Sequence, residues 1–156
     1  MSKKIIIVGP GGSGKDYLRR RMVERGFTYG ISHTTRPKRD GEVDGEDYYF
    51  TDQKFFEDNE DKFLELQTFN VWKYGITKKE FQEKDLFILS PAGLRSLPTE
   101  IREKCFVIYL NPPGEVRLER LNARNDADDA ERRFVGDIRD FFEFSDYDII
   151  ITNEDF

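Results

Sequence analysis

The chain has 156 residues, a length that predicts a single domain. Hydrophobic residues make up 37% of it and aromatic residues 14%, which excludes a chain that is disordered throughout. The net charge of −6 and the pI near 5.0 argue against a nucleic-acid-binding protein, because such proteins usually carry a basic surplus.

The chain opens with a predicted strand followed by a predicted helix. The run KKIIIV (Lys3–Val8) is rich in β-branched residues and is typical of a buried parallel strand. A helical pattern, KDYLRRRMVERG, begins at Lys15 and is expected to stop at Gly26. Its predicted apolar stripe consists of Tyr17, Leu18, Met22 and Val23.

The loop between this strand and helix, GPGGSGKD (Gly9–Asp16), follows the phosphate-binding pattern G-x-x-x-x-G-K-[ST] at every position but the last. Its glycines let the backbone turn tightly and point N–H groups inward, and the start of the helix adds a partial positive charge. A lysine at the position of Lys15 reaches the β- and γ-phosphates of a nucleotide. We therefore expect an ATP site formed by Gly9, Pro10, Gly11, Gly12, Ser13, Gly14, Lys15 and Asp16.

Asp16 departs from the pattern, because a Ser or Thr hydroxyl usually meets the magnesium ion at this position. A carboxylate ~4 Å from a phosphate is repelled by about 4 kcal/mol at an effective dielectric near 20, unless a cation lies between them. Magnesium would reverse that sign, since carboxylates are among its preferred ligands. Three interpretations stay open: Asp16 binds the metal ion, it weakens nucleotide binding, or it only stabilises the helix N-terminus.

The middle of the chain lacks the alternation of strands and helices. The segment DGEVDGEDYYFTD is turn-rich and then strand-like, and KFLELQTFNVWKYGIT predicts extended segments broken by turns. We interpret residues 32–84 as a subdomain inserted into a core made of residues 1–31 and 85–156. We expect it to lie over the carboxyl edge of the sheet, where ligands of open α/β sheets bind.

One stretch of this insert, ISHTTRPKRDGEVDGEDYYF, concentrates hydroxyl groups and arginines within an acidic chain. Arg36 and Arg39 lie three residues apart, and guanidinium groups bind phosphate oxygens in pairs. The stretch therefore predicts a phosphate clamp in which the two arginines act with the hydroxyls of Ser32 and Tyr48. The alternative is a solvated turn with surface arginines.

Three further strand patterns follow, DLFILS (Asp85–Ser90), CFVIYL (Cys105–Leu110) and YDIIITN (Tyr147–Asn153). Between the last two lie two helical patterns, PGEVRLERLNAR and DDAERRFVGDIRDFFEF. The second has a predicted apolar face made of Phe134, Ile138, Phe141 and Phe142. Strands that alternate with helices predict a parallel sheet flanked by helices.

These motifs together resemble the guanylate kinase family, whose pattern is close to S-x-T-T-R-x-x-R-x-G-E-x-x-G-x-x-Y-x-F. The chain matches it at Ser32, Thr34, Thr35, Arg36, Arg39, Gly41, Glu42, Gly45, Tyr48 and Phe50. KFLELQTF, KYGIT, LNPP, RLNAR and YDIIITNEDF resemble further family segments in the same order, so the resemblance covers essentially the whole chain. It implies an α/β fold with a P-loop NTPase-type parallel sheet flanked by helices, an inserted mixed α+β subdomain that binds a nucleoside monophosphate, and a short helical lid at about residues 122–133.

The resemblance also implies roles for single residues. The phosphate of the acceptor monophosphate would be bound by Ser32, Arg36, Arg39, Tyr48 and Tyr74. Glu65 would accept hydrogen bonds from the N1–H and the amino group of guanine, and Thr77 and Ser90 would contact the base. The residues that would act on the transferring phosphoryl group are Lys15, Arg36, Arg124 and Arg133, or Arg132 in place of Arg133. Asn153 would lie near the adenine of ATP, and His33 and Cys105 are expected to be structural.

Four positions depart from the family pattern. Asp16 replaces a hydroxyl, as also occurs in phosphonate-pathway ribose bisphosphokinases, which resemble this chain in the phosphate loop but lack the clamp. Ile76 stands where the family usually has Ser or Thr, and Ser90 stands where it has a second Asp near the guanine. The lid segment RNDADDAERRF is shorter than in the family pattern.

These features predict an enzyme that uses ATP and Mg²⁺ to phosphorylate a nucleoside monophosphate, in the first place GMP or dGMP. Two alternatives stay open: a kinase for other deoxynucleoside monophosphates or for ribose 1,5-bisphosphate, and a non-catalytic module that binds phosphopeptides. The single cysteine and the lack of any run of about 20 apolar residues predict a cytoplasmic protein without a membrane or nucleic-acid partner. We expect a monomer or a homodimer.

Overall fold

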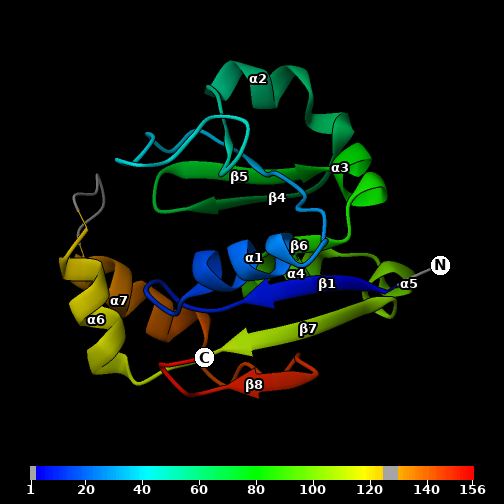
Figure 1. Cartoon of the computed structure of the whole chain (residues 1–156). Coiled ribbons are helices and arrows are strands. Elements are labelled where there is room, and N and C mark those ends of the chain that lie inside the picture. Colours follow the sequence, from blue (N-terminus) through cyan, green and yellow to red (C-terminus); the bar gives the residue numbers. More distant parts are fainter. Residues whose placement is uncertain (1–2, 125–129) are drawn as a thin grey trace.

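Two separate β-sheets with their helices form the frame of the protein, as the computed structural model shows for residues 3–124 and 130–156 (Figure 1). The elements follow in the order β1 (Lys4–Val8), α1 (Lys15–Glu24), β2 (His33–Thr34), β3 (Tyr49–Phe50), α2 (Gln53–Asp58), a 3₁₀ turn (Glu60–Lys62), β4 (Phe63–Phe69), β5 (Trp72–Thr77), α3 (Lys78–Glu83), β6 (Leu86–Ile88), α4 (Pro91–Ser96), α5 (Thr99–Arg102), β7 (Cys105–Leu110), α6 (Gly114–Asn122), α7 (Ala130–Asp140) and β8 (Ile149–Ile151).

The first sheet is parallel throughout and has the order β6-β1-β7-β8. Its central strand β1 pairs with both neighbours, so that Ile6 lies opposite Phe87 on one side and Val107 on the other. All three side chains are fully buried. Continuous apolar runs such as IIIV and CFVIYL suit strands that are covered on both faces, so the predicted parallel sheet is confirmed.

The outer strands of this sheet are shorter than their apolar patterns. The pattern Asp85–Ser90 gives only β6, because Ser90 leaves the strand and caps α4, where its Oγ accepts a hydrogen bond from the N–H of Gly93 (3.0 Å). The pattern Tyr147–Asn153 gives only β8. The carboxylate of Asp148 accepts the Val107 N–H at 2.7 Å and so replaces a backbone partner at the start of that strand.

Helix α1 begins and ends where the sequence predicts, and the chain turns at Gly26 with φ 102°. Its apolar stripe is narrower than expected, because Leu18 and Met22 pack on the sheet whereas Tyr17 and Val23 are exposed. In this helix, sequence reasoning missed the burial of Arg19. Its Nη2 donates to Asp47 Oδ1 at 2.7 Å, and its guanidinium lies 4.6 Å from the ring centre of Tyr29.

Helix α7 corrects a second predicted face. Phe141 stacks on Tyr109 in the core, but Ile138 is 52% exposed and Phe142 is 75% exposed. The helix ends at Asp140, so the helical spacing that grouped Phe142 with the others does not continue to it. The most buried side chain of α7 is instead that of Asp137.

The second sheet has the order β3-β2-β5-β4, and a hairpin joins β4 to β5. Asn70 turns that hairpin with φ 60°. The far side of this sheet is packed with aromatic rings: Phe56 stacks on Phe63, and His33 stacks on Phe55. Burial lowers the pKa of His33, so this histidine behaves as a neutral aromatic packing residue.

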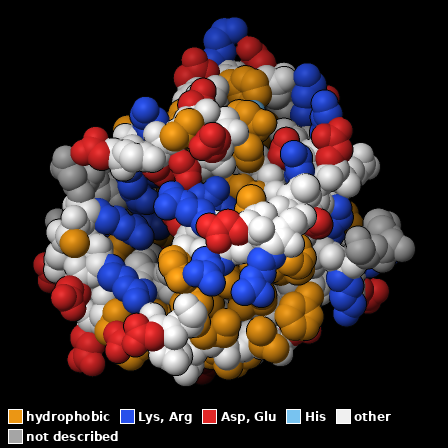
Figure 2. All heavy atoms as spheres, viewed as in Figure 1, with side chains coloured by type: hydrophobic (Ala, Val, Ile, Leu, Met, Phe, Trp, Pro, Cys, Tyr) orange, Lys and Arg blue, Asp and Glu red, His pale blue; other side chains and the backbone are white. Residues whose placement is uncertain are grey.

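The carboxyl ends of β1 and β7 point toward α6 and α7, and the hairpin of the second sheet lies above the first sheet (Figure 1). Figure 2 shows Lys and Arg side chains gathered on one face at the level where the two layers meet, although the chain as a whole is acidic. The predicted lid contains the end of α6, the start of α7 and residues 125–129, which lie outside the described residues. No helix in the described ranges is long and apolar enough to cross a bilayer.

Candidate active site

A cavity of about 730 Å³ lies where the carboxyl end of the parallel sheet faces the second sheet. It brings together most residues that the sequence assigned to a site: Gly9, Gly11, Gly12, Ser13, Gly14, Lys15, Asp16, Ser32, Arg36, Arg39, Tyr48, Glu65, Tyr74, Ser90, Arg124 and Arg133. These residues come from segments far apart in the chain. The phosphate loop and the predicted arginine clamp therefore share one space.

The phosphate loop holds its lysine against its own backbone. Gly12 and Gly14 adopt φ values of 76° and 97°, which only glycine adopts without strain, and a Cβ on Gly12 would lie 2.6 Å from the carbonyl oxygen of Arg117. The Nζ of Lys15 donates to the carbonyl oxygen of Gly9 at 2.5 Å. Burial, with Arg133 nearby, lowers the pKa of Lys15 to about 8 although Asp137 and Asp16 oppose the shift. An incoming phosphate would replace the carbonyl as the partner of this ammonium group.

Asp16 lies at the first turn of α1 and lines the cavity with a side chain that is 61% exposed. Its Oδ1 lies 3.5 Å from Nη2 of Arg19, which is itself fixed on Asp47. Among the residues that the structure describes, no group of three or more His, Cys, Asp or Glu could hold a metal ion alone. One accessible carboxylate beside a phosphate site nevertheless fits Mg²⁺, which usually binds one or two carboxylates together with substrate phosphates and water.

Arg36 is the centre of the clamp and is only 2% exposed. Glu42 grips it with both oxygens, since Nη1 donates to Oε1 at 3.0 Å and Nη2 donates to Oε2 at 2.9 Å. The backbone N–H of Arg39 also donates to Glu42 Oε1, at 2.7 Å. Burial opposes the charge on Arg36, but the hydrogen bonds to Glu42 outweigh it and raise the pKa of Arg36. Glu42, which the sequence analysis only counted as a pattern match, thus organises both arginines.

Two tyrosines complete the clamp. The ring centres of Tyr48 and Tyr74 lie 6.1 Å apart, and the guanidinium carbon of Arg36 lies 5.2 Å from the Tyr48 ring. Burial raises the pKa of Tyr48 to about 12 and also raises the pKa of Tyr74, so both hydroxyls stay protonated and can donate to a phosphate. Ser32 lines the same end of the cavity and is buried.

Glu65 occupies a different part of the cavity, on β4, and is 7% exposed. Its Oε1 accepts the Ile76 N–H at 3.2 Å, and burial raises the pKa of its carboxyl group to about 7. A Cβ on Gly93 would lie 3.0 Å from Oε2, so the glycine leaves room for the carboxylate against α4. Ser90 lies beside this group with its Oγ accepting from the Gly93 N–H. A carboxylate here matches the two adjacent donors that guanine offers.

Three predicted site residues do not line the cavity. The Oγ of Thr77 caps α3 by accepting the Glu80 N–H at 3.2 Å, so it does not reach the base pocket. The Oδ1 of Asn153 accepts the Asp155 N–H at 3.0 Å, and Glu154, Asp155 and Phe156 line the cavity in its place. Pro10 stabilises the phosphate loop through its backbone, since its carbonyl oxygen accepts the Ser13 N–H.

The polar cavity residues that sequence reasoning missed include Arg120, Gln67 and Asp137. Arg120 donates through Nη1 to the carbonyl oxygen of Gly12 at 2.9 Å and so braces the phosphate loop. Gln67 lies opposite Tyr74 in the β4–β5 hairpin and two residues after Glu65, and that alternation could have placed it on the same face. Asp137 accepts the Gly11 N–H at 2.8 Å. No sequence signal separated it from the other acidic residues of its helix.

The fold and the loop define a P-loop NTPase-type α/β protein. A family model described as guanylate kinase matches residues 1–156. A guanylate kinase of Nostoc sp. is 34% identical over 166 residues, covering 99% of this chain and 83% of the relative. One from Bradyrhizobium diazoefficiens is 32% identical over 163 residues, covering 96% of this chain and 74% of the relative. The crystal structure of guanylate kinase from Anaplasma phagocytophilum aligns with a TM-score of 0.74 and 23% identity over 99% of this chain and 78% of that one, which supports the fold.

The protein belongs to the guanylate kinase family and is therefore an enzyme, a nucleoside monophosphate kinase. The resemblance that the sequence motifs carried is confirmed, and so is the predicted fold class. Neither a ribose bisphosphate kinase nor a phosphopeptide-binding module gains support from these matches.

Proposed function

We propose that this enzyme transfers the γ-phosphoryl group of ATP to GMP or dGMP. The observation that carries the proposal is the shared cavity, which has the phosphate loop with Lys15 on one side and the clamp with Arg36, Arg39 and Tyr48 on the other. Two anionic nucleotides would be brought end to end in that space. Transfer between them needs positioning and charge neutralisation rather than a covalent enzyme intermediate.

On the acceptor side, the clamp would bind the monophosphate and Glu65 would select the base. Guanine presents N1–H and an amino group side by side, and an ionised carboxylate accepts both, whereas adenine presents an acceptor at N1. With guanine bound, the two donors would stabilise the ionised carboxylate of the buried Glu65, and a base without those donors cannot provide this interaction. GMP and dGMP are thus the acceptors that this pocket fits best.

On the donor side, the loop N–H groups and Lys15 would hold the phosphates of ATP, with Arg124 and Arg133 neutralising the charge that develops on transfer. Asp16 would hold a Mg²⁺ ion at the edge of the loop. The metal, when bound, would neutralise phosphate charge. Residues 32–84 would act as the acceptor subdomain and residues 122–133 as a lid that excludes water from the reaction.

A panel of acceptors tests this function. The protein is incubated with ATP and Mg²⁺ and with GMP, dGMP, AMP, CMP, UMP, dTMP or ribose 1,5-bisphosphate, and ADP release is measured. We expect kcat/KM for GMP or dGMP to exceed that for every other acceptor by about 100-fold or more, and we expect no turnover after chelation of the metal. If no acceptor stimulates ADP release, the kinase function is wrong, and equal rates with all bases would contradict the role of Glu65.

A further inference from the structure

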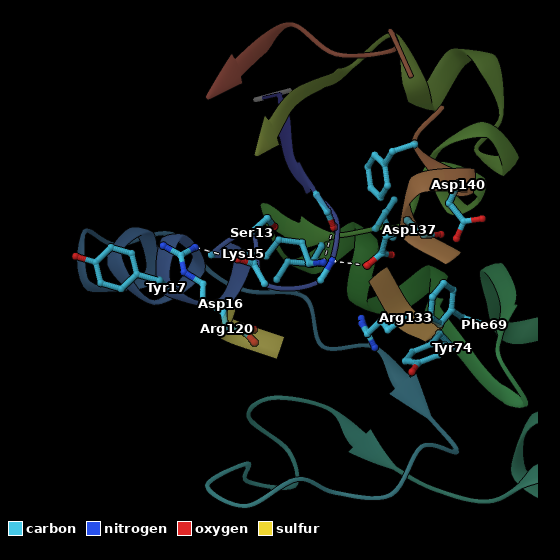
Figure 3. A pocket seen from close by; sticks show the side chains of 18 of the residues that line it. Ser13, Lys15, Asp16, Tyr17, Phe69, Tyr74, Arg120, Arg133, Asp137 and Asp140 are labelled. Atoms are coloured by element: carbon cyan, nitrogen blue, oxygen red, sulfur yellow. Dashed lines mark hydrogen bonds between the residues drawn. The ribbon is translucent and has the colours of Figure 1, made fainter. Parts of the chain in front are cut away.

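Asp137 is a buried acid inside a cavity that must accept polyanions. Its side chain is 5% exposed, and it comes from the middle of α7, the helix that also carries Arg133 one turn earlier. In Figure 3 the Asp137 side chain points from α7 to the phosphate loop, where a dashed line marks its hydrogen bond. The proposed function gives this carboxylate no task, although burying a charge is costly unless it is well paired.

The side chains of Asp137 and Arg133, both on α7, lie against the same residue of the phosphate loop, Gly11. Oδ2 of Asp137 accepts the Gly11 N–H at 2.8 Å. A Cβ added to Gly11 would lie 2.7 Å from Nε of Arg133 and 3.0 Å from Oδ2 of Asp137. Gly11 therefore leaves the space in which α7 docks on the loop, and its N–H fixes the docking point. The contact ties the helix to the loop across 126 residues of sequence.

Arg133 is held from the other side by the second sheet. Its guanidinium carbon lies 5.3 Å from the ring centre of Phe69, and Figure 3 shows it between Phe69 and Tyr74 on one side and the loop on the other. An arginine placed there would face the phosphoryl group in transit between the loop and the clamp. A displacement of about 1 Å in such a group can cost 10²-fold in rate.

We propose that Asp137 is a positioning residue for phosphoryl transfer, which fastens α7 to Gly11 and so holds Arg133 beside Lys15. The inference rests on the proposed function, since it assigns Asp137 a part in that reaction. The carboxylate has a second effect, because it offsets the positive charges around Lys15. Among residues 3–124 and 130–156, the charged groups that act on Lys15 are Asp16 on α1, Arg124 after α6, and Arg133 and Asp137 on α7.

Three variants test the inference. D137A removes the acceptor and the charge, D137N keeps an oxygen that can accept the Gly11 N–H, and E131Q is a matched control that removes one exposed negative charge from the same helix. We expect D137A to lower kcat by about 10- to 100-fold, with KM for GMP changed by less than about threefold. D137N should recover most of that kcat, and E131Q should match the wild type.

The split between kcat and KM, together with the rescue by D137N, separates positioning from a contribution to folding alone. Thermal unfolding of each variant checks that the rates refer to folded protein.

Hydrogen exchange of the peptide that contains Gly11, in the protein without nucleotide, gives a readout that does not need turnover. We expect faster exchange in D137A than in wild type and E131Q. If wild type is active and D137A matches E131Q in kcat and in exchange, the inference is wrong while the proposed function stands. If the wild type phosphorylates no acceptor, the proposed function is wrong. The catalytic part of the inference is then wrong too, even if hydrogen exchange shows that Asp137 holds the loop at Gly11.

Discussion

The phosphate loop and the arginine clamp face each other across one cavity, yet their positive groups are held in different ways. The loop presents backbone N–H groups and a lysine that bonds to a carbonyl of its own loop. The clamp presents Arg36, which Glu42 already grips with two hydrogen bonds. In the proposed reaction the lysine would change partner when a nucleotide binds, whereas the arginine is already held by Glu42.

The difference has a thermodynamic consequence. Burial disfavours the charge on Lys15 and lowers its pKa, while the pKa of Arg36 is raised by its carboxylate partner. Removing the lysine should therefore leave the fold unharmed, but removing the arginine would leave Glu42 partly buried without its partner. We therefore expect the loop lysine to affect the reaction alone, and the clamp arginine to affect both binding and stability.

The largest effect is expected from Lys15→Met. The variant loses the ammonium group that would neutralise phosphate charge during transfer, so kcat should fall by about 10³-fold. The melting temperature should stay within about 2 °C of wild type, since the lysine donates to a carbonyl oxygen of its own loop and this contact does not join distant parts of the fold. Steady-state kinetics and calorimetry measure the two quantities. Lys104→Met, at an exposed site, is the control.

The contrasting variant is Arg36→Lys, which keeps the charge but cannot form the two-pronged contact with Glu42. We expect KM for GMP to rise by about 30- to 100-fold and the free energy of unfolding to fall by about 1–3 kcal/mol. Urea unfolding and acceptor titration measure both, with Arg25→Lys, at the exposed residue that follows α1, as the control. A variant that loses affinity but no stability would show that the clamp is not pre-formed.

Glu65→Gln tests whether the charge of a buried carboxylate on the acceptor side of the cavity affects stability. The folded pKa of about 7 lies above the ordinary value of 4.5, so ionisation of Glu65 destabilises the nucleotide-free protein as pH rises through that interval. Glutamine keeps an oxygen for the Ile76 N–H and carries no charge. The variant should be more stable than wild type by about 2 kcal/mol at pH 8, with a smaller gain at pH 5.

The same variant should lose base selectivity, with the preference for GMP over AMP falling by about tenfold or more. Melting curves at several pH values and competition between the two acceptors provide the measurements. A stability difference that does not depend on pH would contradict the buried, titrating carboxyl group.

The sequence predicted those parts of the molecule that follow from local pattern. The β-branched runs predicted the parallel sheet, and the glycine-rich pattern with its lysine predicted the loop that lines the cavity, because both depend on residues close together in the chain. Glu65 was assigned through the family resemblance, and the structure places it in the cavity. The sequence did not distinguish the role of Thr77 from that of Ser90, since either hydroxyl can cap a helix or face a ligand.

What sequence reasoning missed depends on contacts between distant segments. Helical spacing predicted an apolar face on α7 with Ile138 and Phe142, but the helix turns Asp137 inward because the Gly11 N–H lies there to receive it. Sequence reasoning assigned no role to Arg19, whose burial depends on Asp47 from the loop before β3. A local sequence pattern does not identify the distant residue that pairs with a buried charged side chain.

The Arg19–Asp47 pair also bears on how the enzyme could move. It joins the first helix of the parallel sheet to the loop that carries Tyr48, and both side chains are nearly buried. Removing one member of a buried ion pair costs about 3–5 kcal/mol, because the other charge is left without a partner. A movement of the two layers that separated Arg19 from Asp47 would therefore be opposed by the loss of this contact.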